Sequence, residues 1–528
     1  LTSTHPRTSL FSTFKVVDSS SLLAGLNYEY VEYEDPSSRP ERVKIKFCDI
    51  IPEWEKAPQE RIREIADRPL YRHQLEAYEA LKEGKNIILI SGTGSGKTEA
   101  WALYALKHKR RALVVYPTLA LSEDQVARLW EYYYSLNMIA VRIDRSTIDQ
   151  LSKELGGLAE VKRRIISSKL IITNPAFLIA ELKRIARRSK RAVLDAHLKD
   201  LELIVLDELD YYNPRQVVML FRALEWLLET FYGQSKPQMA ILTATLSNPE
   251  EVADYLTQLT GREVAIIAGR PFRVKNKTYI VLGKNLRRIY EKLKSQTPKV
   301  EEKDPELASL LKEALRDFET FKRSIPMLIT LAEENEILRE VIDPNEFRSA
   351  PEEIIAEYVK ANEDGVTLVF TPSIRSCERL VRRIRELLPK ELKDKVVTHH
   401  HLIDRERRRQ IEIKARKGEI KVIVSVRTLL QGIDIGIACR VVHYGLPQAV
   451  REFRQREGRK GRREYIPFTE TLIFPITSWD RRMIEAGIEV VRTWIRSPLE
   501  RLYLNFNNLN TNRNLNLYYT KFGSQGKF

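Results

Sequence analysis

Short, continuous apolar runs alternate along most of this chain with longer stretches in which apolar residues recur at helical spacing. In the first half, the runs lie at 87–90, 111–117, 169–175, 201–210 and 238–245. A second series begins at Gly365, and its runs lie at 367–373, 395–401, 420–426, 440–447 and 471–476. Buried strands joined by amphipathic helices are typical of parallel sheets that are covered on both faces. The pattern therefore predicts an α/β chain with two tandem parallel-sheet domains.

Changes in composition predict where these domains begin and end. The first residues form short β-like runs broken by serine and proline, and we interpret them as an accessory region. A charged stretch of helical period between the two sheets is interpreted as a linker with a helical insertion, and the asparagine-rich end as a flexible or truncated tail. The predicted segments are 1–65 (accessory region), 66–274 (first sheet domain), 275–362 (linker with insertion), 363–500 (second sheet domain) and 501–528 (tail).

The stretch IILISGTGSGKTE, from Ile87 to Glu99, has the pattern of a phosphate-binding loop. A strand, a glycine-rich turn and a helix start follow one another, so backbone N–H groups and the helix N-terminus converge on an anion. We expect Lys97 to reach the β- and γ-phosphates of a nucleotide and Thr98 to bind Mg²⁺. The strict pattern has glycine in place of Ser91, so the loop alone indicates a nucleoside triphosphate site, with a plain glycine-rich turn as the alternative. The expected cradle is Gly92, Thr93, Gly94, Ser95, Gly96, Lys97 and Thr98.

Polar residues end several of the predicted strands, and functional residues of a parallel sheet gather at those ends. Asp207 is expected to hold Mg²⁺ through water, and Glu208 to polarise the attacking water as a general base. The alternative, an exposed strand end, leaves two carboxylates beside a buried run without a purpose. Thr243 and Thr245 end another strand, and we expect their hydroxyls to bond the Asp207–Glu208 segment.

Composition adds a bias toward positive charge. The chain has 88 Lys and Arg against 72 Asp and Glu, and this net charge of +16 favours a polyanionic partner, with solvated surface charge as the alternative. Its three cysteines lie far apart, so we expect neither disulfides nor a structural zinc site. No apolar run approaches the roughly 20 residues of a membrane span, so we expect no membrane partner and a reducing, cytoplasmic compartment. The chain begins with Leu1, so it is a fragment or uses an unusual start.

Two further clusters in the second half are judged by their spacing. The triplet His399–His401 resembles a set of metal ligands, but consecutive residues on a strand point to opposite faces, so we expect no metal site there. Basic stretches at Arg379–Arg385 and Arg405–Arg409 are expected to add positive field for a nucleic acid, and part of either can be ordinary surface.

The order of the motifs resembles that of the superfamily 2 helicases over roughly residues 70–465. The matching segments are YRHQ (71–74), SGTGSGKTE (91–99), PTLAL (117–121), TNP (173–175), DELD (207–210), TAT (243–245), VFTPSIRS (369–376), SVRTLLQGIDIG (425–436) and QREGRKGRR (455–463). Within the superfamily, the chain looks closest to the MrfA-type (mitomycin repair factor A) DNA helicases, with the Lhr-type as neighbours. It departs from that branch at Asp210, where histidine is usual, and the sequence does not contain the branch's four-cysteine C-terminal metal domain.

The resemblance implies two RecA-like domains that share one ATP and Mg²⁺ site and together bind nucleic acid. It also implies that Thr243 and Thr245 couple hydrolysis to movement. Residues implied to contact the nucleotide are Gln74 at the adenine edge, Gly432 and Asp434 near the ribose, and Gln455, Arg459 and Arg462 at the γ-phosphate. Small donors at strand ends are implied to contact nucleic-acid phosphates, and these are Thr118, Thr173, Asn174, Thr371, Ser373 and Thr428.

These observations favour an ATP-dependent helicase or translocase that moves along single strands and unwinds duplexes. DNA and 3′-to-5′ movement are favoured only because the branch that the chain resembles has them. The enzyme alternatives are an RNA helicase and a translocase that does not separate strands. An ATP-gated nucleic-acid binding clamp is the alternative of another class, because backbone contacts do not declare the sugar or the outcome of hydrolysis. The oligomeric state is left open.

Overall fold

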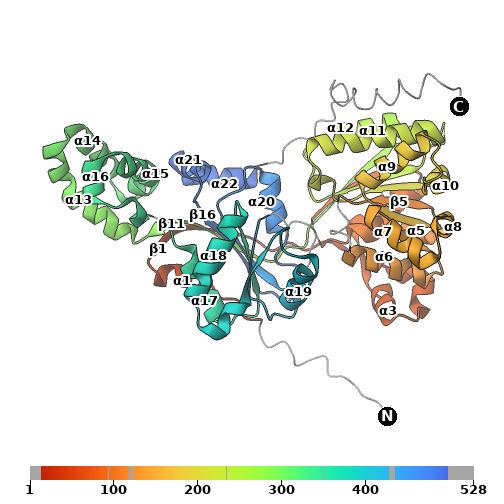
Figure 1. Ribbon diagram of the computed structural model, residues 1–528, viewed down its shortest axis with the longest axis horizontal. Helices are drawn as coiled ribbons and strands as arrows, with labels where there is room; N and C mark the ends of the chain where they lie inside the picture. The colour runs from red at the N-terminus through yellow and green to blue at the C-terminus, as the bar shows by residue number, and fades with distance from the viewer. Residues whose placement is uncertain are drawn as a thin grey trace, which may run out of the picture. The chain divides into compact units, whose positions relative to one another are not determined.

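The computed structural model describes residues 14–92, 94–117, 123–233, 235–347, 349–426 and 435–497, and these form two compact units. The first unit comprises residues 39–272, and the second comprises the described residues up to 38 and from 273 onward. Each unit is built around one large sheet that is covered by helices (Figure 1). The predicted α/β class with two tandem parallel sheets is confirmed.

The sheet of the first unit is parallel throughout its described strands. In spatial order, its strands are β10 (Val264–Gly269), β4 (Asn86–Ser91), β9 (Gln238–Thr243), β8 (Leu203–Leu206), β5 (Ala112–Val115), β7 (Leu170–Thr173) and β6 (Ala140–Arg142). Because β4, β9 and β8 are neighbours, their carboxyl ends bring the phosphate loop, the threonine motif and the carboxylate motif side by side.

Helices cover both faces of this sheet. Along β4, Ile87 and Leu89 belong to one hydrophobic core and Ile88 to the other, as the alternation of a strand requires. The helices of the unit include α2 (Phe47–Ile50), α3 (Glu60–Ala66), α4 (Arg72–Lys82), α5 (Lys97–Lys107), α6 (Glu123–Ser135), α7 (Arg145–Leu155), α8 (Leu158–Ser167), α9 (Pro175–Ala186), α10 (Asp195–Lys199), α11 (Pro214–Phe231) and α12 (Pro249–Thr260). Two short strands, β2 (Arg42–Lys46) and β3 (Pro69–Tyr71), form a separate antiparallel pair.

The sheet of the second unit is parallel except at one edge. In spatial order, its strands are β1 (Tyr28–Asp35), β11 (Asn276–Lys284), β16 (Thr469–Phe474), β15 (Ala438–Tyr444), β12 (Val366–Phe370), β14 (Val422–Ser425) and β13 (Val396–His399). The edge strand β1 runs antiparallel to β11, so a segment from the start of the chain completes the sheet of the second unit.

The helices of the second unit fall into two groups. The larger group packs on the sheet and comprises α1 (Ser19–Gly25), α17 (Pro351–Lys360), α18 (Ile374–Glu386), α19 (Arg405–Arg416), α20 (Val450–Glu457), α21 (Ser478–Glu485) and α22 (Ile488–Arg496). The other group is inserted in the chain between β11 and α17, and it comprises α13 (Leu286–Lys303), α14 (Pro305–Ala314), α15 (Phe318–Glu334) and α16 (Glu336–Val341). This insertion packs on α21 through α15, and it projects to one side of the second unit (Figure 1).

The observed units divide the chain differently from the predicted segments. Residues 14–38 lie with the second unit, whereas 39–65 lie with the first, so the predicted accessory region 1–65 is split between the two. The predicted linker 275–362 contains an internal strand of the second sheet, β11, next to the edge strand β1, in addition to the inserted helices. The predicted tail at 501–528 lies outside the described residues.

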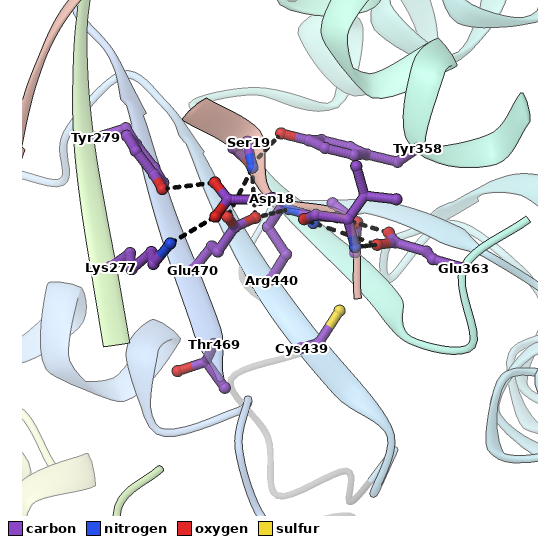
Figure 2. Close-up of polar contacts among 12 residues, drawn as sticks. Asp18, Ser19, Lys277, Tyr279, Tyr358, Glu363, Cys439, Arg440, Thr469 and Glu470 are labelled. Atoms are coloured by element: carbon purple, nitrogen blue, oxygen red, sulfur yellow. Dashed lines mark hydrogen bonds and ion pairs between the residues drawn. The ribbon is translucent and has the colours of Figure 1, made fainter. Parts of the chain in front are cut away.

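A buried ion network holds the N-terminal segment on the second unit (Figure 2). Arg440 on β15 is fully buried, and its guanidinium donates to Glu470 at 2.7 Å and to Glu363 at 2.6 Å. The same guanidinium donates to the carbonyl of Val17 at 2.7 Å and lies over the ring of Tyr358. The segment thus supplies a partner that the buried arginine would otherwise lack.

The N-terminal segment also satisfies the two buried carboxylates of this network. The backbone N–H of Ser19 donates to Glu470 at 2.8 Å, and the Ser19 hydroxyl donates to the same carboxylate at 2.5 Å. The N–H of Val17 donates to Glu363 at 3.0 Å. Buried charges are stable only when they are paired and fully hydrogen-bonded, so these bonds explain why residues 14–38 fold onto the second unit.

We expect Arg440→Met to lower the free energy of unfolding by about 3–5 kcal/mol, because it leaves Glu363 and Glu470 buried without their cation. The matched control is Arg383→Met, which removes a half-exposed arginine 3.3 Å from Glu352 and should cost less than about 1 kcal/mol. Urea unfolding of both variants measures the difference. Equal losses in the two variants would contradict the role given to the network.

Candidate nucleotide site

The predicted phosphate loop joins β4 to the N-terminus of α5. Gly94 and Gly96 have φ of +79° and +76°, a region that favours glycine, and Gly96 is the N-cap residue of α5. Lys97 is 7% exposed, and its ammonium donates to the carbonyl of Ser91 at 2.8 Å and to that of Gly92 at 3.4 Å. The lysine is therefore held across the mouth of the loop, beside a helix N-terminus that attracts anions.

The surroundings of the loop explain its departure from the strict glycine pattern. Ser91 is the last residue of β4 and pairs with Gly269 of β10. A Cβ atom on Gly269 would lie 2.6 Å from the Ser91 hydroxyl oxygen, so the glycine leaves the room that the serine side chain occupies. A Cβ on Gly92 would lie 2.6 Å from the Cβ of Pro271, which explains the glycine retained there.

Gln74 lies beside the loop, as the resemblance implies, but both ends of its amide have partners in the protein. Its Oε1 accepts from the N–H of Tyr71 at 2.9 Å, and its Nε2 donates to the carbonyl of Gly96 at 3.0 Å. His73 also reaches the loop, because its Nε2 lies 2.9 Å from the carbonyl of Ser95. In this state Gln74 ties α4 to the loop, and adenine recognition through its amide stays a prediction. Thr93 lies outside the described residues.

The two predicted carboxylates follow β8 directly. Asp207 is 1% exposed, and its Oδ1 accepts from the N–H of Glu208 at 2.8 Å, whereas its Oδ2 is buried with no hydrogen-bond partner among the described residues. Burial, with the nearby charge of Glu208, raises the pKa of Asp207 to about 7, although Lys97 opposes the shift. Glu208 has a φ of +54°, which is rare for a residue with a side chain and is typical of strained functional positions.

The threonine motif contacts the carboxylate motif, but at a different residue from the one predicted. The hydroxyl of Thr243 lies 3.0 Å from Oδ1 of Asp210 and 2.8 Å from the carbonyl oxygen of Thr245, and its one proton is shared between these two acceptors. The N–H of Ala244 donates to the same Asp210 oxygen at 3.1 Å. The predicted bond to Asp207–Glu208 is thus made to Asp210, the position at which this chain departs from its branch.

These residues fit a triphosphate with a bound Mg²⁺. The unsatisfied oxygen of Asp207 is an acceptor that a water of the metal shell would use, and Lys97 offers a buried cation to the phosphates. Thr98, buried in the first turn of α5, is placed as the predicted second metal residue. Within the described ranges, no group of three or more His, Cys, Asp or Glu could hold a metal ion, and His399 and His400 lie near different glutamates, Glu412 and Glu378.

The residues predicted to contact nucleic acid differ in exposure. Thr173 and Thr371 are buried, and their hydroxyls donate to the carbonyls of Ile143 at 2.8 Å and Ser373 at 3.1 Å. Asn174 and Ser373 cap the N-termini of α9 and α18 and are at least partly exposed. Contacts through the two buried hydroxyls would require these internal bonds to break, so the prediction is better supported for the two caps. Thr118 and Thr428 lie outside the described residues.

The last motif forms the end of α20 and the turn after it. Gln455 is on the helix, which ends at Glu457, so Arg459 and Arg462 lie on the turn. Arg459 is largely buried, and the Nε of Arg462 donates to the carbonyl of Gly458 at 3.0 Å. We call residues 458–463 the arginine turn. Gly432 and Asp434, predicted near the ribose, lie outside the described residues.

Sequence reasoning missed several residues that shape these sites. His73 was inside a quoted motif, but nothing in its pattern indicated a bond to the loop. Gly269 and Pro271 pack against the loop from a strand distant in sequence, so only the fold identifies them. Tyr116 is fully buried near Asp207. Burial, together with the charge of Asp207, keeps the pKa of the Tyr116 hydroxyl well above its usual range.

Both sheet units match known helicase domains. Residues 71–252 match the family model described as DEAD/DEAH box helicase, and residues 350–464 match the helicase conserved C-terminal domain. Among solved structures, the DUF1998 helicase MrfA bound to DNA and AMPPNP is similar with a TM-score of 0.67, 21% identity, and coverage of 93% of this chain and 59% of that chain. Helicase Lhr of Mycobacterium smegmatis, bound to ssDNA and AMP-PNP, has a TM-score of 0.58, 21% identity, and coverage of 84% and 50%. The predicted resemblance to superfamily 2 helicases of the MrfA and Lhr types is confirmed.

Curated relatives carry helicase names. The uncharacterized ATP-dependent helicase YprA of Bacillus subtilis is 27% identical over 75% of this chain and 45% of its own length. The ATP-dependent helicase Lhr-Core of Sulfolobus acidocaldarius is 24% identical over 74% of this chain and 39% of its own. The chain thus spans about half the length, or less, of these relatives. Every helix in the described ranges is too short or too polar to cross a membrane.

Lys97 and Glu208 have separate places in this site, so their variants should fail differently. Lys97→Ala removes the buried cation and should weaken nucleotide binding and abolish turnover. Glu208→Gln keeps the shape but cannot accept a proton, so it should bind nucleotide normally and lower turnover by about two to four orders of magnitude. Binding of a fluorescent ATP analogue and steady-state phosphate release measure the two effects. Normal turnover in Glu208→Gln would remove Glu208 from the chemistry.

Proposed function

Because the chain carries both domains of the DEAD/DEAH box helicases, we propose that it hydrolyses ATP to move along single-stranded nucleic acid and to unwind duplexes. DNA is the proposed substrate, since the similar MrfA and Lhr structures hold DNA or ssDNA. The proposed direction is 3′-to-5′, because the branch that the chain resembles moves in that direction. The observation that carries the proposal is Asp207, a buried carboxylate with one unbonded oxygen, next to the strained Glu208 and the Lys97 loop.

The proposed roles follow from the chemistry of each group. Lys97 binds the β- and γ-phosphates and offsets the charge that develops during transfer. Asp207 and Thr98 hold Mg²⁺, which supplies further positive charge at the phosphates when it is bound. Glu208 accepts a proton from the attacking water, and its partial exposure leaves it open to that water.

Residues of the second unit are proposed to complete the site when ATP is bound. Arg459 and Arg462 contact the γ-phosphate, assisted by Gln455, because a guanidinium offers several donors in one plane and keeps its charge. Gly432 and Asp434 are proposed near the ribose, and Gln74 at the adenine. Closure of the two units around the nucleotide would then link hydrolysis to movement.

Nucleic acid is proposed to bind through its phosphates. The caps Asn174 and Ser373 are the exposed candidates among the predicted donors, and Thr118, Thr173, Thr371 and Thr428 complete the proposed set. The arginine-rich helices α18 and α19 add positive charge to the second unit. Such contacts ignore base sequence, so affinity for single strands should depend on salt and hardly on sequence.

Unwinding of labelled duplexes with single-stranded tails tests the proposal directly. With ATP and Mg²⁺, we expect a DNA duplex with a 3′ tail to be separated catalytically, and a blunt or 5′-tailed duplex to remain paired. Separation of an RNA duplex instead would identify an RNA helicase. ATP turnover without separation would identify a non-unwinding translocase, and release of one strand per bound protein would identify an ATP-gated clamp.

The Thr243–Asp210 bond generates a prediction about coupling. Thr243→Val keeps the shape and removes the hydroxyl that joins the threonine motif to Asp210, and Thr245→Ala removes the second hydroxyl of the motif. Neither residue carries charge for the phosphates, so the double variant should keep strand-stimulated ATPase within a few-fold and lose unwinding. ATPase, unwinding and melting temperature are measured on the same protein.

The matched control is Thr257→Val, which removes a helix hydroxyl that donates to its own helix at Ala253. It should leave ATPase and unwinding unchanged. If Thr243 and Thr245 only cap the strand, the double variant should lose both activities and stability in parallel, and the coupling role would be wrong.

A further inference from the structure

Lys460 lies inside the arginine turn, between Arg459 and Arg462, and is buried. Its side chain is only 5% exposed. The ammonium donates to the Glu457 carboxylate at 2.8 Å, to the backbone carbonyl of Glu470 at 2.8 Å and to the hydroxyl of Thr471. An ammonium has three protons, so these three acceptors satisfy it completely. A solvated member of a basic run would not be held in this way.

The Glu457 carboxylate bonds Lys460 and two residues of the sheet. Its Oε2 accepts from Lys460 and from the Thr471 hydroxyl at 2.7 Å, and its Oε1 lies 3.0 Å from Nε2 of His443. The bonds to Lys460 and His443 lower the pKa of Glu457 to about 2, and burial lowers the pKa of His443 to about 4. At neutral pH, Glu457 is ionised and His443 is neutral and donates through Nε2.

The backbone of the turn is fixed to the same sheet. The N–H of Gly461 donates to the carbonyl of Ala438 at the start of β15, at 2.9 Å. Gly461 has a φ of +66°, and a Cβ atom there would lie 3.0 Å from a methyl carbon of Thr469. The turn is therefore bonded to β15 through Gly461 and to β16 through Lys460, at two adjacent residues between the arginines.

We propose that Glu457 and Lys460 are positioning residues that hold the arginine turn in the geometry in which Arg459 and Arg462 meet the γ-phosphate. This inference rests on the proposed function, which gives those two arginines their role. An ion pair that is largely shielded from water and has several fixed acceptors keeps its geometry better than an exposed pair, because less water competes for its bonds. Donors that are fixed before the reaction stabilise developing charge without a cost of reorganisation.

The second unit contains a matched control for the Glu457–Lys460 pair. Along β15 and β16, Arg440 and Glu470 point to the face of the N-terminal segment (Figure 2), whereas His443 and Thr471 bond Glu457 of α20. Glu363 of the Arg440 network is at least as deeply buried as Glu457 or Lys460, and it makes an ion pair with Arg440 at 2.6 Å. Among the described residues, its carboxylate bonds Val17 and Arg440 and makes no bond to the arginine turn, so its loss should affect stability alone.

The test compares Glu457→Gln, Lys460→Met and the double variant with Glu363→Gln, and Arg459→Ala is the reference. For each protein, we measure kcat and KM for ATP of the strand-stimulated ATPase, at a temperature well below its measured melting temperature. Displacement of a catalytic group by about 1 Å can cost on the order of a hundredfold in rate. We expect Glu457→Gln and Lys460→Met to lose at least about tenfold in kcat with KM little changed, because the phosphate loop is intact.

The double variant separates positioning from stability. Removing both charges of a buried pair should restore much of the melting temperature that either single change loses. If the pair positions the arginines, kcat stays low in the double variant, whereas Glu363→Gln loses melting temperature and keeps kcat. Recovery of kcat together with melting temperature would show a merely structural role and would overturn the inference.

The reference variant Arg459→Ala distinguishes the positioning role of Glu457 and Lys460 from the proposed role of the arginine itself. If Arg459→Ala loses turnover and both Glu457→Gln and Lys460→Met keep it, only the positioning inference fails. If Arg459→Ala keeps full turnover, the arginine has no role at the γ-phosphate, and the positioning inference falls with that part of the proposed function.

Discussion

The structure depends above all on the position of Lys97, whose ammonium is fixed on the carbonyls of Ser91 and Gly92 beside the buried Asp207. That position follows from the strand order of the first unit, in which β4, β9 and β8 are adjacent and parallel. Their carboxyl ends therefore bring the loop, Thr243 and Asp207 to one edge of the sheet. Changes in any of these strands would act on the site through this edge.

The buried charges of the Arg440 and Lys460 networks differ from that of Asp207 in how fully they are bonded. In the second unit, Arg440 and Lys460 are each surrounded by acceptors, which come from distant segments for Arg440 and from residues within eleven positions for Lys460. In the first unit, one oxygen of Asp207 is buried without a bond among the described residues, and burial raises its pKa. A satisfied network adds rigidity, whereas an unsatisfied carboxylate is poised for a ligand. The contrast separates the groups that build the protein from the group that we assign to the metal.

Sequence patterns predicted the two sheets and the residues at the strand ends, because apolar runs and the polar clusters that end them are local signals. The glycine-rich loop was equally readable, since its backbone geometry requires glycine at Gly94 and Gly96. The place of residues 14–38 was not predictable, because it depends on Glu363, Arg440 and Glu470, which are far from that segment in sequence. Nor was the bond from the Gln74 amide to the carbonyl of Gly96, which the fold brings beside α4.

The basic turn after α20 contains charged residues whose roles could be separated only once their burial was known. In the sequence, QREGRKGRR is a run of charge whose arginines gain a role only through resemblance. In the structure, Glu457 and Lys460 form a largely buried pair that bonds two strands. The residues between the predicted motif positions therefore fix the turn on the sheet. Spacing alone gave no signal for this, because a solvated lysine and a buried one look alike in a charged run.

The central claim is that the Lys97–Asp207 site turns over ATP in response to a bound strand. Steady-state ATP hydrolysis with and without single-stranded DNA, at low and at high salt, tests it most directly. We predict slow turnover without the strand, an increase of at least about tenfold at saturating strand, and loss of that increase as salt displaces the phosphate contacts. Turnover that is equal with and without the strand would contradict the account.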